Sequence, residues 1–125
     1  MTVTRRRTGE IAEKLVAARL AASGWQIVER NARTRYGEID IVARDGRALV
    51  FVEVKAARAG TRLGPERPIL SIGPRKQRQV RRLATAWMAE RRDVPPYDEI
   101  RFDAVGITLD GRDRPTDVDY VRGAF

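Results

Sequence analysis

Two short segments on either side of an Asp45-Gly46 dipeptide constrain the fold more than any other part of the chain. Residues 37–43 and 48–54 are rich in aliphatic and β-branched side chains, and an Asp-Gly pair between two such runs is a strong signal for a β-hairpin. With the turn centred on Asp45-Gly46, Asp40 lies opposite Phe51. The sequence therefore predicts an antiparallel pair of strands near the middle of the chain.

The charged side chains of this hairpin alternate with apolar ones. Because neighbouring residues of a strand point to opposite faces, the pattern predicts one charged face and one aliphatic core face. The charged face comprises Glu38, Asp40, Phe51, Glu53 and Lys55, and the core face comprises Ile39, Ile41, Val50, Val52 and Val54. On this pairing Asp40 and Glu53 are diagonal neighbours, whose Cβ atoms lie within ~7–8 Å of each other.

Two carboxylates at this spacing indicate a site for a small cation. Leu49 and Phe51 beside Glu53 predict partial burial of the acids, where uncompensated like charges are costly. Oxygen ligands are those that Mg²⁺ and Mn²⁺ prefer, and a lysine such as Lys55 beside the ion suits phosphate chemistry. The alternative is a solvated sheet face on which Glu53 and Lys55 form an ordinary ion pair.

The remaining pattern predicts two helices, three further strands and one long loop. Helices are expected over residues 10–23 and 75–92, strands over residues 25–30, 99–108 and 116–121, and a Gly/Pro-rich loop over residues 57–74. We expect a single α/β domain over residues 1–125, with residues 1–8 as a flexible basic arm. Its fold class is a mixed β-sheet flanked by helices, in the order αβββαββ.

Apolar stripes mark the buried side of each helix. The first stripe comprises Ile11, Leu15, Ala18 and Ala22, and the second comprises Val80, Leu83, Ala84 and Trp87. Thr8 is the candidate N-cap of the first helix. Trp25, Trp87 and Phe102 are expected in the core, and Asp103 is expected to pair with an arginine.

Composition excludes several classes of chemistry. The chain has no cysteine and no histidine, so no disulfide, thiolate nucleophile, imidazole base or Cys/His zinc site can be built from it. No apolar run approaches the ~18 residues that cross a bilayer, and no apolar segment of the kind found in signal peptides follows Arg5–Arg7. We therefore expect a soluble cytoplasmic protein.

The positive charge of the chain is concentrated in blocks. The net charge is +8, and residues 56–92 alone hold ten basic and two acidic side chains. Such blocks favour a polyanion, most commonly nucleic acid, although an ordinary basic surface in an arginine-rich protein is the alternative. The residues expected to contact phosphates are Arg33, Arg75, Lys76, Arg78, Arg81 and Arg82.

The hairpin resembles the signature of a known family. The segment 37–43 followed by 50–55 is similar to the YraN-like family of small bacterial proteins, which belongs by resemblance to the PD-(D/E)XK nuclease superfamily, near archaeal Holliday-junction resolvases. The similarity extends to Gly9, Glu10, Glu13, Asn31, Arg33, Gly64, Lys76, Arg101-Phe102-Asp103 and Ala124-Phe125. It implies a restriction-endonuclease-like core, although Ile39 stands where the superfamily motif has proline.

The resemblance implies a set of site residues. Asp40 and Glu53 would be metal ligands together with the backbone carbonyl of Val54, and Lys55 would be the catalytic lysine. The cofactor implied is Mg²⁺ or Mn²⁺.

An acid of the first helix would complete the site. Glu13 occupies the resolvase-like position and is the candidate for catalysis and metal binding, and Glu10, one turn earlier, is the second candidate for the metal ligand.

The function expected from these residues is a Mg²⁺-dependent endonuclease that hydrolyses DNA, including branched or structured DNA. The alternative is a non-catalytic nucleic-acid-binding module on a nuclease-like scaffold. A weaker third reading is a structural partner that docks through the acidic C-terminal block. Symmetric cleavage of a two-fold junction would call for a homodimer.

Overall fold

Five strands form one sheet with the order β1-β2-β3-β4-β5 in the computed structural model, which describes residues 3–60 and 68–125. The elements are α1 (Val3–Ala22), β1 (Gln26–Thr34), β2 (Gly37–Asp45), β3 (Ala48–Arg58), the 3-10 helix η1 (Pro68–Ser71), α2 (Pro74–Glu90), β4 (Glu99–Leu109) and β5 (Pro115–Val121). β3 and β4 are parallel, and the other neighbouring strands are antiparallel. The predicted mixed sheet and the order αβββαββ are confirmed.

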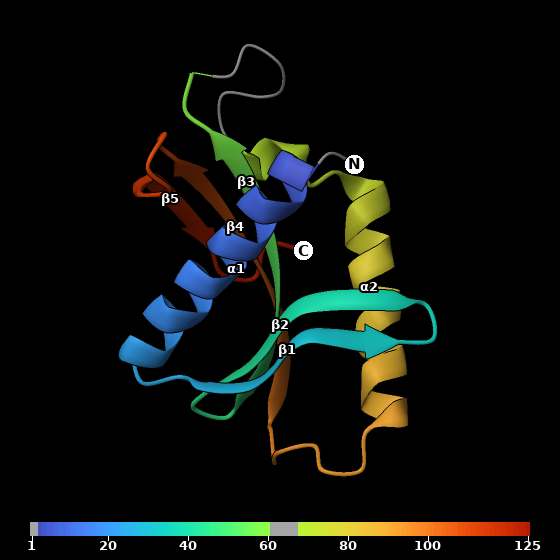
Figure 1. Cartoon of the computed structure of the whole chain (residues 1–125). Coiled ribbons are helices and arrows are strands. Elements are labelled where there is room, and N and C mark those ends of the chain that lie inside the picture. Colours follow the sequence, from blue (N-terminus) through green and yellow to red (C-terminus); the bar gives the residue numbers. More distant parts are fainter. Residues whose placement is uncertain (1–2, 61–67) are drawn as a thin grey trace.

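The two α-helices cover opposite faces of this sheet (Figure 1). The core under α1 includes Val16 and Leu20 together with Ile41, Val50, Val52, Val105 and Ile107. The core under α2 includes Val80, Leu83 and Trp87 together with Ile39, Val42, Leu49, Phe51 and Phe102. The predicted stripe of α2 is confirmed, as is the burial of Trp25, Trp87 and Phe102.

The first helix differs from its prediction at both the stripe and the start. Ala18 and Ala22 are exposed, because the buried face is formed by Ala12, Val16, Ala17 and Leu20, with Ile11 and Leu15 beside it. The helix begins at Val3, so the segment predicted as a basic arm is helical from that residue onward, and Met1 and Thr2 lie outside the described residues. Thr8 lies inside the helix instead of capping it.

The predicted loop over residues 57–74 contains more regular structure than expected. Strand β3 continues to Arg58, η1 occupies Pro68–Ser71, and α2 begins at Pro74. Residues 61–67, which include Gly64, lie outside the described residues.

The turn between β2 and β3 is displaced by one residue from its predicted centre. Asp45 pairs with Ala48 and Ile41 pairs with Val52, so the turn residues are Gly46 and Arg47. Extending this register by one residue places Asp40 opposite Glu53, instead of opposite Phe51 as predicted. The shift leaves Asp40 and Glu53 on one face of the hairpin, because it moves the pairing by an even number.

The β1-β2 hairpin bends where Asn31 lies across from Asp40. Asn31 has a φ of 50°, a left-handed conformation that asparagine tolerates better than most residues. Ile41 packs under α1, whereas Ile39, two residues earlier, packs under α2. A regular strand would place both on one face, so the prediction that they share a face was wrong.

This bend separates β2 from β3, and we call the divergence beyond Ile41 and Val52 the fork. The β2-β3 pairing ends at these two residues, while β2 remains paired with β1 as far as Gly37 and β3 remains paired with β4 as far as Arg58. The tip of the β1-β2 hairpin therefore crosses toward α2, while β3 continues beside β4 (Figure 1).

Among the described residues, no helix is long and apolar enough to cross a membrane.

The close approach of η1 to the sheet depends on Gly106 of β4. A Cβ atom at this position would lie 2.8 Å from the backbone nitrogen of Ile69. Such a contact is repulsive, and the atom it meets belongs to the backbone and not to a flexible side chain. Gly106 thereby holds η1, and the start of the chain segment that leads into α2, against the sheet beside Lys55.

The substitution Gly106→Ala is expected to destabilise the protein by ~1–3 kcal/mol, because η1 must move away from β4. Urea unfolding followed by circular dichroism measures the free energy of unfolding. Gly9→Ala is the matched control, since a Cβ there meets nothing within 4 Å and α1 gains a better helix former. Equal stability of wild type and Gly106→Ala would contradict the prediction.

Candidate functional site

The fork brings Asp40 of β2 and Glu53 of β3 together. Because β2 no longer pairs with β3 at this point, the backbone N–H of Val54 donates to Oδ2 of Asp40 at 2.8 Å instead of to a strand carbonyl. The N–H and C=O of one strand residue point toward the same neighbouring strand, so the carbonyl of Val54 faces the same edge of β3. Glu53 is 6% exposed, and Asp40 is half-buried.

Glu13 reaches the same place from α1. Burial, the charge of Asp40 and a hydrogen bond with the Asp40 carboxylate raise the pKa of Glu13 to about 8. Burial also raises the pKa of Asp40, and the hydrogen bond from the N–H of Val54 opposes this rise. Burial followed by the charge of Asp40 raises the pKa of Glu53 to about 7. The three carboxyl groups therefore form one electrostatically linked cluster, which we call the acidic site.

Two lysines supply positive charge to the acidic site. Nζ of Lys76, in the first turn of α2, lies 3.2 Å from Oε1 of Glu53. Lys55 follows Glu53 by two residues on β3, is half-buried, and its charge lowers the pKa of Glu53. Sequence reasoning placed Lys76 among the phosphate contacts and missed its contact with Glu53. The available signal was that Lys14, Lys55 and Lys76 are the only lysines in the chain.

The two candidate acids of α1 differ in position. Glu13 is half-buried within the acidic site, whereas Glu10 is exposed, and among the described contacts none joins Glu10 to Asp40 or Glu53. The geometry therefore favours Glu13 over Glu10.

The chemistry of the acidic site fits a hard divalent cation. Its side chains offer carboxylate oxygens, and burial first and the charge of Asp40 second raise the pKa values of Glu13 and Glu53, both of which a bound cation would oppose. Within residues 3–60 and 68–125, no group of three or more acidic side chains has the geometry to hold a metal ion. Mg²⁺ commonly uses one or two protein carboxylates and completes its shell with water and phosphate, so a pair such as Asp40 and Glu53 is compatible with this ion.

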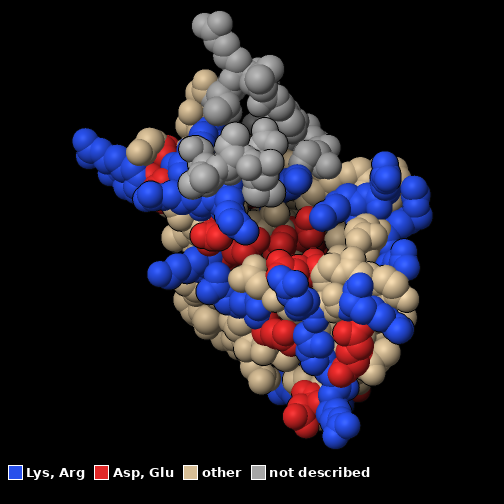
Figure 2. Space-filling model, turned by 45° about the vertical axis from the view of Figure 1, so that its right-hand side comes forward, with Lys and Arg blue, Asp and Glu red and all other residues tan. Residues whose placement is uncertain are grey.

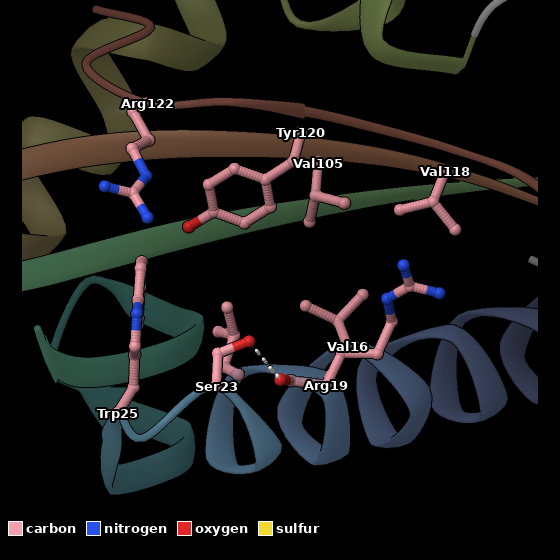
Figure 3. A pocket seen from close by; sticks show the side chains of 9 residues that line it. Val16, Arg19, Ser23, Trp25, Val105, Val118, Tyr120 and Arg122 are labelled. Carbon is pink, nitrogen blue, oxygen red and sulfur yellow. Dashed lines mark hydrogen bonds between the residues drawn. The ribbon is translucent and has the colours of Figure 1, made fainter.

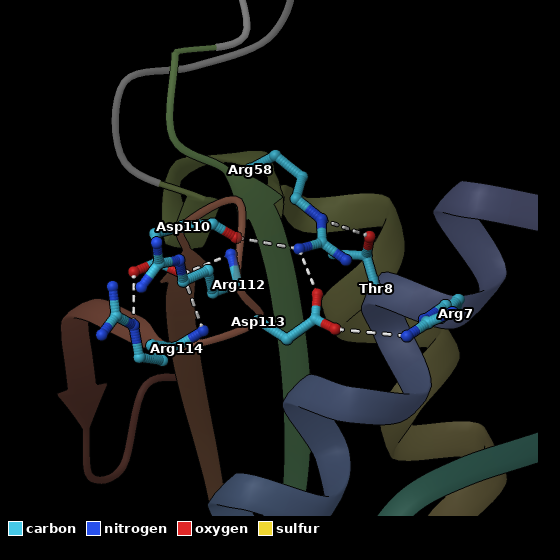
Figure 4. A network of polar contacts seen from close by, with 7 residues as sticks. All are labelled: Arg7, Thr8, Arg58, Asp110, Arg112, Asp113 and Arg114. Carbon is cyan, nitrogen blue, oxygen red and sulfur yellow. Dashed lines mark hydrogen bonds and ion pairs between the residues drawn. The ribbon is translucent and has the colours of Figure 1, made fainter.

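A polar network joins the N-terminal half of α1 to the end of β3 and to the turn between β4 and β5 (Figure 4). Arg58, at the end of β3, donates from Nε to Oγ1 of Thr8 at 3.0 Å and from Nη1 to the carbonyl of Asp110 at 3.0 Å. Nη1 of Arg58 also pairs with Asp113, which lies 3.4 Å from Nη2 of Arg7. These contacts hold the N-terminal half of α1, and with it Glu13, in place.

The predicted phosphate contacts lie mainly on the surface of α2. Arg75, Arg78, Arg81 and Arg82 are exposed, and Arg33 of β1 is exposed and pairs with Glu38 at 3.0 Å. One face of the molecule carries acidic side chains near its centre with Lys and Arg side chains around them (Figure 2). An open hollow of about 530 Å³ at the start of α2 is lined by Gly73, Pro74, Arg75, Lys76 and Gln79.

A separate cavity of about 320 Å³ lies on the α1 side of the sheet (Figure 3). Its lining residues are Val16, Arg19, Leu20, Ser23, Trp25, Val105, Val118, Tyr120 and Arg122. None of these is a carboxylate, so this cavity has no counterpart of the acidic site. Trp25 packs edge-on against Tyr120 there, with ring centroids 6.1 Å apart.

Asp103 is a structural residue at the centre of β4. It is fully buried, and Arg101 contacts it from Nε at 2.9 Å, which confirms the predicted pairing. The hydroxyl of Tyr120 donates to it at 2.6 Å and the N–H of Gly123 at 2.9 Å. These bonds account for its buried charge and attach β5 and the residues after it to β4.

Known proteins with similar sequences cover the whole chain. Residues 12–107 match the family described as "Uncharacterised protein family UPF0102". A UPF0102 protein of Streptomyces griseus subsp. griseus is 45% identical over 115 residues, which are 92% of each chain. The chain belongs to the UPF0102 family.

Other UPF0102 proteins match this chain over nearly the full length of both sequences. The relative from Moorella thermoacetica is 42% identical over 100% of both chains, and the relative from Acidothermus cellulolyticus is 43% identical over 97% of this chain and 95% of its own. UPF0102 membership agrees with the resemblance to the YraN-like family. The relation to the PD-(D/E)XK superfamily remains a prediction.

The thermal stability of this UPF0102 protein is expected to fall as the pH rises from 5.5 to 8.5. The folded-state pKa values of Glu13, about 8, and Glu53, about 7, exceed the ordinary value of 4.5, so the folded state keeps protons that the unfolded chain has released. The stability that these carboxyls contribute is complete below about pH 4.5 and is lost as the pH rises through 7 and 8.

Unfolding midpoints across this pH range measure the effect. The absence of histidine leaves few other side chains that change charge in this window. Glu13→Gln should flatten the pH dependence, whereas Glu10→Gln, an exposed glutamate on the same helix, should leave it unchanged. An unfolding midpoint that rises with pH would contradict the raised pKa values of Glu13 and Glu53.

Proposed function

We propose that this protein is a Mg²⁺-dependent endonuclease that cleaves DNA, including branched or structured DNA, in the bacterial cytoplasm. The observation that carries the proposal is the meeting of Asp40, Glu53 and Glu13 with two lysines at the fork, next to the basic surface of α2. Acidic ligands for an ion and basic contacts for phosphates are the two requirements of metal-assisted phosphodiester hydrolysis.

Each residue of the acidic site would have a separate role. Asp40 and Glu53 would hold Mg²⁺, or Mn²⁺ in its place, with the carbonyl of Val54 as a third oxygen. A divalent ion in this position supplies a positive charge that polarises the scissile phosphate and lowers the pKa of a water molecule. Lys55 would orient that water and donate to the charged phosphate in the transition state. Glu13 would bind the water molecules around the ion.

Lys76 would act as a charge partner of Glu53. Its ammonium nitrogen lies 3.2 Å from Oε1 of Glu53 and neutralises part of the negative charge of the acidic site. A bound cation would neutralise the same charge. Lys76 stands at the start of α2, so it also joins the acidic site to the arginines that would contact the DNA backbone.

The hairpin signature and the place of these residues support membership in the PD-(D/E)XK superfamily, which is part of the proposal. One acidic site cuts one strand at a time, so cleavage of both strands of a two-fold junction would use a homodimer.

A non-catalytic nucleic-acid-binding module is the second candidate. The observation that favours it is that no group of three acidic side chains among the described residues has metal-binding geometry. This candidate shares the basic surface of α2 and needs no metal. Metal binding therefore separates the two.

Mg²⁺ or Mn²⁺ is expected to raise the unfolding midpoint of the wild type and to leave that of Asp40→Asn unchanged. An ion that binds only the folded state adds ~2.7 kcal/mol to stability at 100 times its dissociation constant. Asn at position 40 can still accept the hydrogen bond from Val54, so the variant tests the charge. Asp93→Asn, which changes an exposed aspartate after α2, is the matched control.

Cleavage of labelled linear and branched DNA in Mg²⁺ tests the reaction itself. Asp40→Asn and Lys55→Ala should each reduce the rate by ~100-fold or more. Lys14→Ala, which changes an exposed lysine of α1, should retain activity. Cleavage that survives both site substitutions would contradict the assigned catalytic residues. DNA binding without cleavage and without any metal effect would support the non-catalytic candidate.

The affinity for duplex DNA is expected to depend steeply on salt. Four exposed arginines of α2 that each neutralise one phosphate predict a slope of roughly −3 to −4 in a plot of log affinity against log salt. Substitution of Arg75 or Arg78 by alanine should reduce the slope by about 1. Arg19→Ala, which changes an exposed arginine of α1, should leave the slope unchanged. Fluorescence anisotropy at several salt concentrations measures the slope, and a value near zero would exclude α2 as the contact surface.

A further inference from the structure

Tyr36 is an exposed aromatic residue in the turn between β1 and β2. Its surface is 41% exposed, and the guanidinium of Arg82 on α2 lies 3.9 Å from the centre of its ring. Arg35 lies farther away, at 5.1 Å. Guanidinium groups stack on aromatic faces by cation–π attraction, so Tyr36 and Arg82 form a stacked pair across two elements of the fold.

The turn that carries Tyr36 is held in one conformation. The hydroxyl of Thr34 donates to the carbonyl of Gly37 at 2.9 Å and accepts from the N–H of Tyr36 at 3.1 Å. Gly37 has a φ of 138°, and a Cβ atom there would lie 3.4 Å from Leu83 of α2. A preorganised aromatic residue loses little conformational entropy when it binds a ligand.

The turn is also attached to α2. Nε of Arg35 lies 3.7 Å from Glu90, and the backbone N–H of Arg35 donates to the same carboxylate at 3.4 Å. Arg91 donates to the carbonyl of Arg33 at 2.9 Å and pairs with Glu29 at 2.8 Å. The tip of the β1-β2 hairpin and α2 therefore carry arginines on both sides of Tyr36, and Glu90 and Glu29 pair with two of the arginines that join them.

Tyr36 and the acidic site contact the same helix, α2, at different points along its length. Lys76 contacts Glu53, Gln79 lies near Gly37, and Arg82 stacks on Tyr36, so these residues follow the side of α2 that faces the hairpin. Six residues of helix from Lys76 to Arg82 span about 9 Å. An axial separation of this size corresponds to two or three nucleotides at the ~3.4 Å spacing of phosphates along one strand.

We propose that the Tyr36–Arg82 pair is a stacking platform for an unpaired nucleobase beside the phosphate held at the acidic site. The inference rests on the proposed function and narrows the substrate to nucleic acid with an unpaired base at or near the cleavage point. Aromatic rings bind bases that lie outside a duplex, because a paired base offers no free face. The surrounding arginines would contact the backbone, and the platform would add the preference for unpaired bases.

Fluorescence anisotropy with EDTA present tests binding apart from cleavage. Three labelled oligonucleotides of equal length serve as probes: a single strand, the same strand with abasic positions, and a duplex. Tyr36→Ala should weaken binding of the normal single strand by roughly 5- to 100-fold. The same variant should bind the abasic strand as the wild type does, because the phosphates are unchanged.

Tyr97 provides the matched control. It is 40% exposed, follows α2 at the end remote from Lys76, and its hydroxyl lies near Met88. Tyr97→Ala should bind all three probes as the wild type does. Tyr36→Phe should retain affinity for the single strand, since the ring remains. If Tyr36→Ala fails to fold, Tyr36→Leu replaces it, because leucine keeps apolar bulk and removes the ring.

The outcomes separate the two proposals. Unchanged binding of the single strand by the Tyr36 variants, or an equal loss on the abasic strand, would overturn the stacking platform and leave the proposed nuclease intact. Absence of binding by the wild type to every probe would overturn both. Loss of cleavage in Asp40→Asn with unaltered single-strand binding would support the nuclease and the platform as separate parts of one surface.

Discussion

The end of the β2-β3 pairing at Ile41 and Val52 is the constraint on which the rest of the structure depends. Beyond this pair the N–H of Val54 would lose its strand partner, and the carboxylate of Asp40 takes that place at 2.8 Å. A buried N–H without an acceptor is costly, so the fork requires an acceptor at this position. The same carboxylate lies beside Glu53 and Glu13, so the side chain that accepts this backbone hydrogen bond is also part of the acidic site.

The acidic site works against the stability of the fold around it. Burial and mutual repulsion raise the pKa values of Glu13 and Glu53, which means that their charged forms are disfavoured in the folded state. Two apolar cores, one on each face of the sheet, and the buried bonds of Asp103 supply the compensating stability. Strain that is concentrated at one cluster and balanced elsewhere is typical of a functional site.

The period-two pattern of residues 37–55 predicted the β2-β3 hairpin and the shared face of Asp40 and Glu53, because alternation survives an even change of register. The apolar periodicity of the rest of the chain predicted the order of the elements. The period-two pattern did not predict the face of Ile39, since the left-handed Asn31 bends the hairpin and no alternation rule contains that bend. The contact of Lys76 with Glu53 joins residues far apart in sequence, so it depended on how α2 docks. Membership in UPF0102 supports the family resemblance and carries no statement of activity.

The attachment of the hairpin to α2 has a mechanical consequence. Arg91, directly after α2, pairs with Glu29 and donates to the carbonyl of Arg33, so the tip of the β1-β2 hairpin and the end of α2 are joined. A load applied at the tip would be carried by β2, which holds Asp40, and by α2, which holds Lys76, whereas Glu53 lies on β3, which no longer pairs with β2 at this point. Pulling on the tip would therefore shift Asp40 and Lys76 together relative to Glu53.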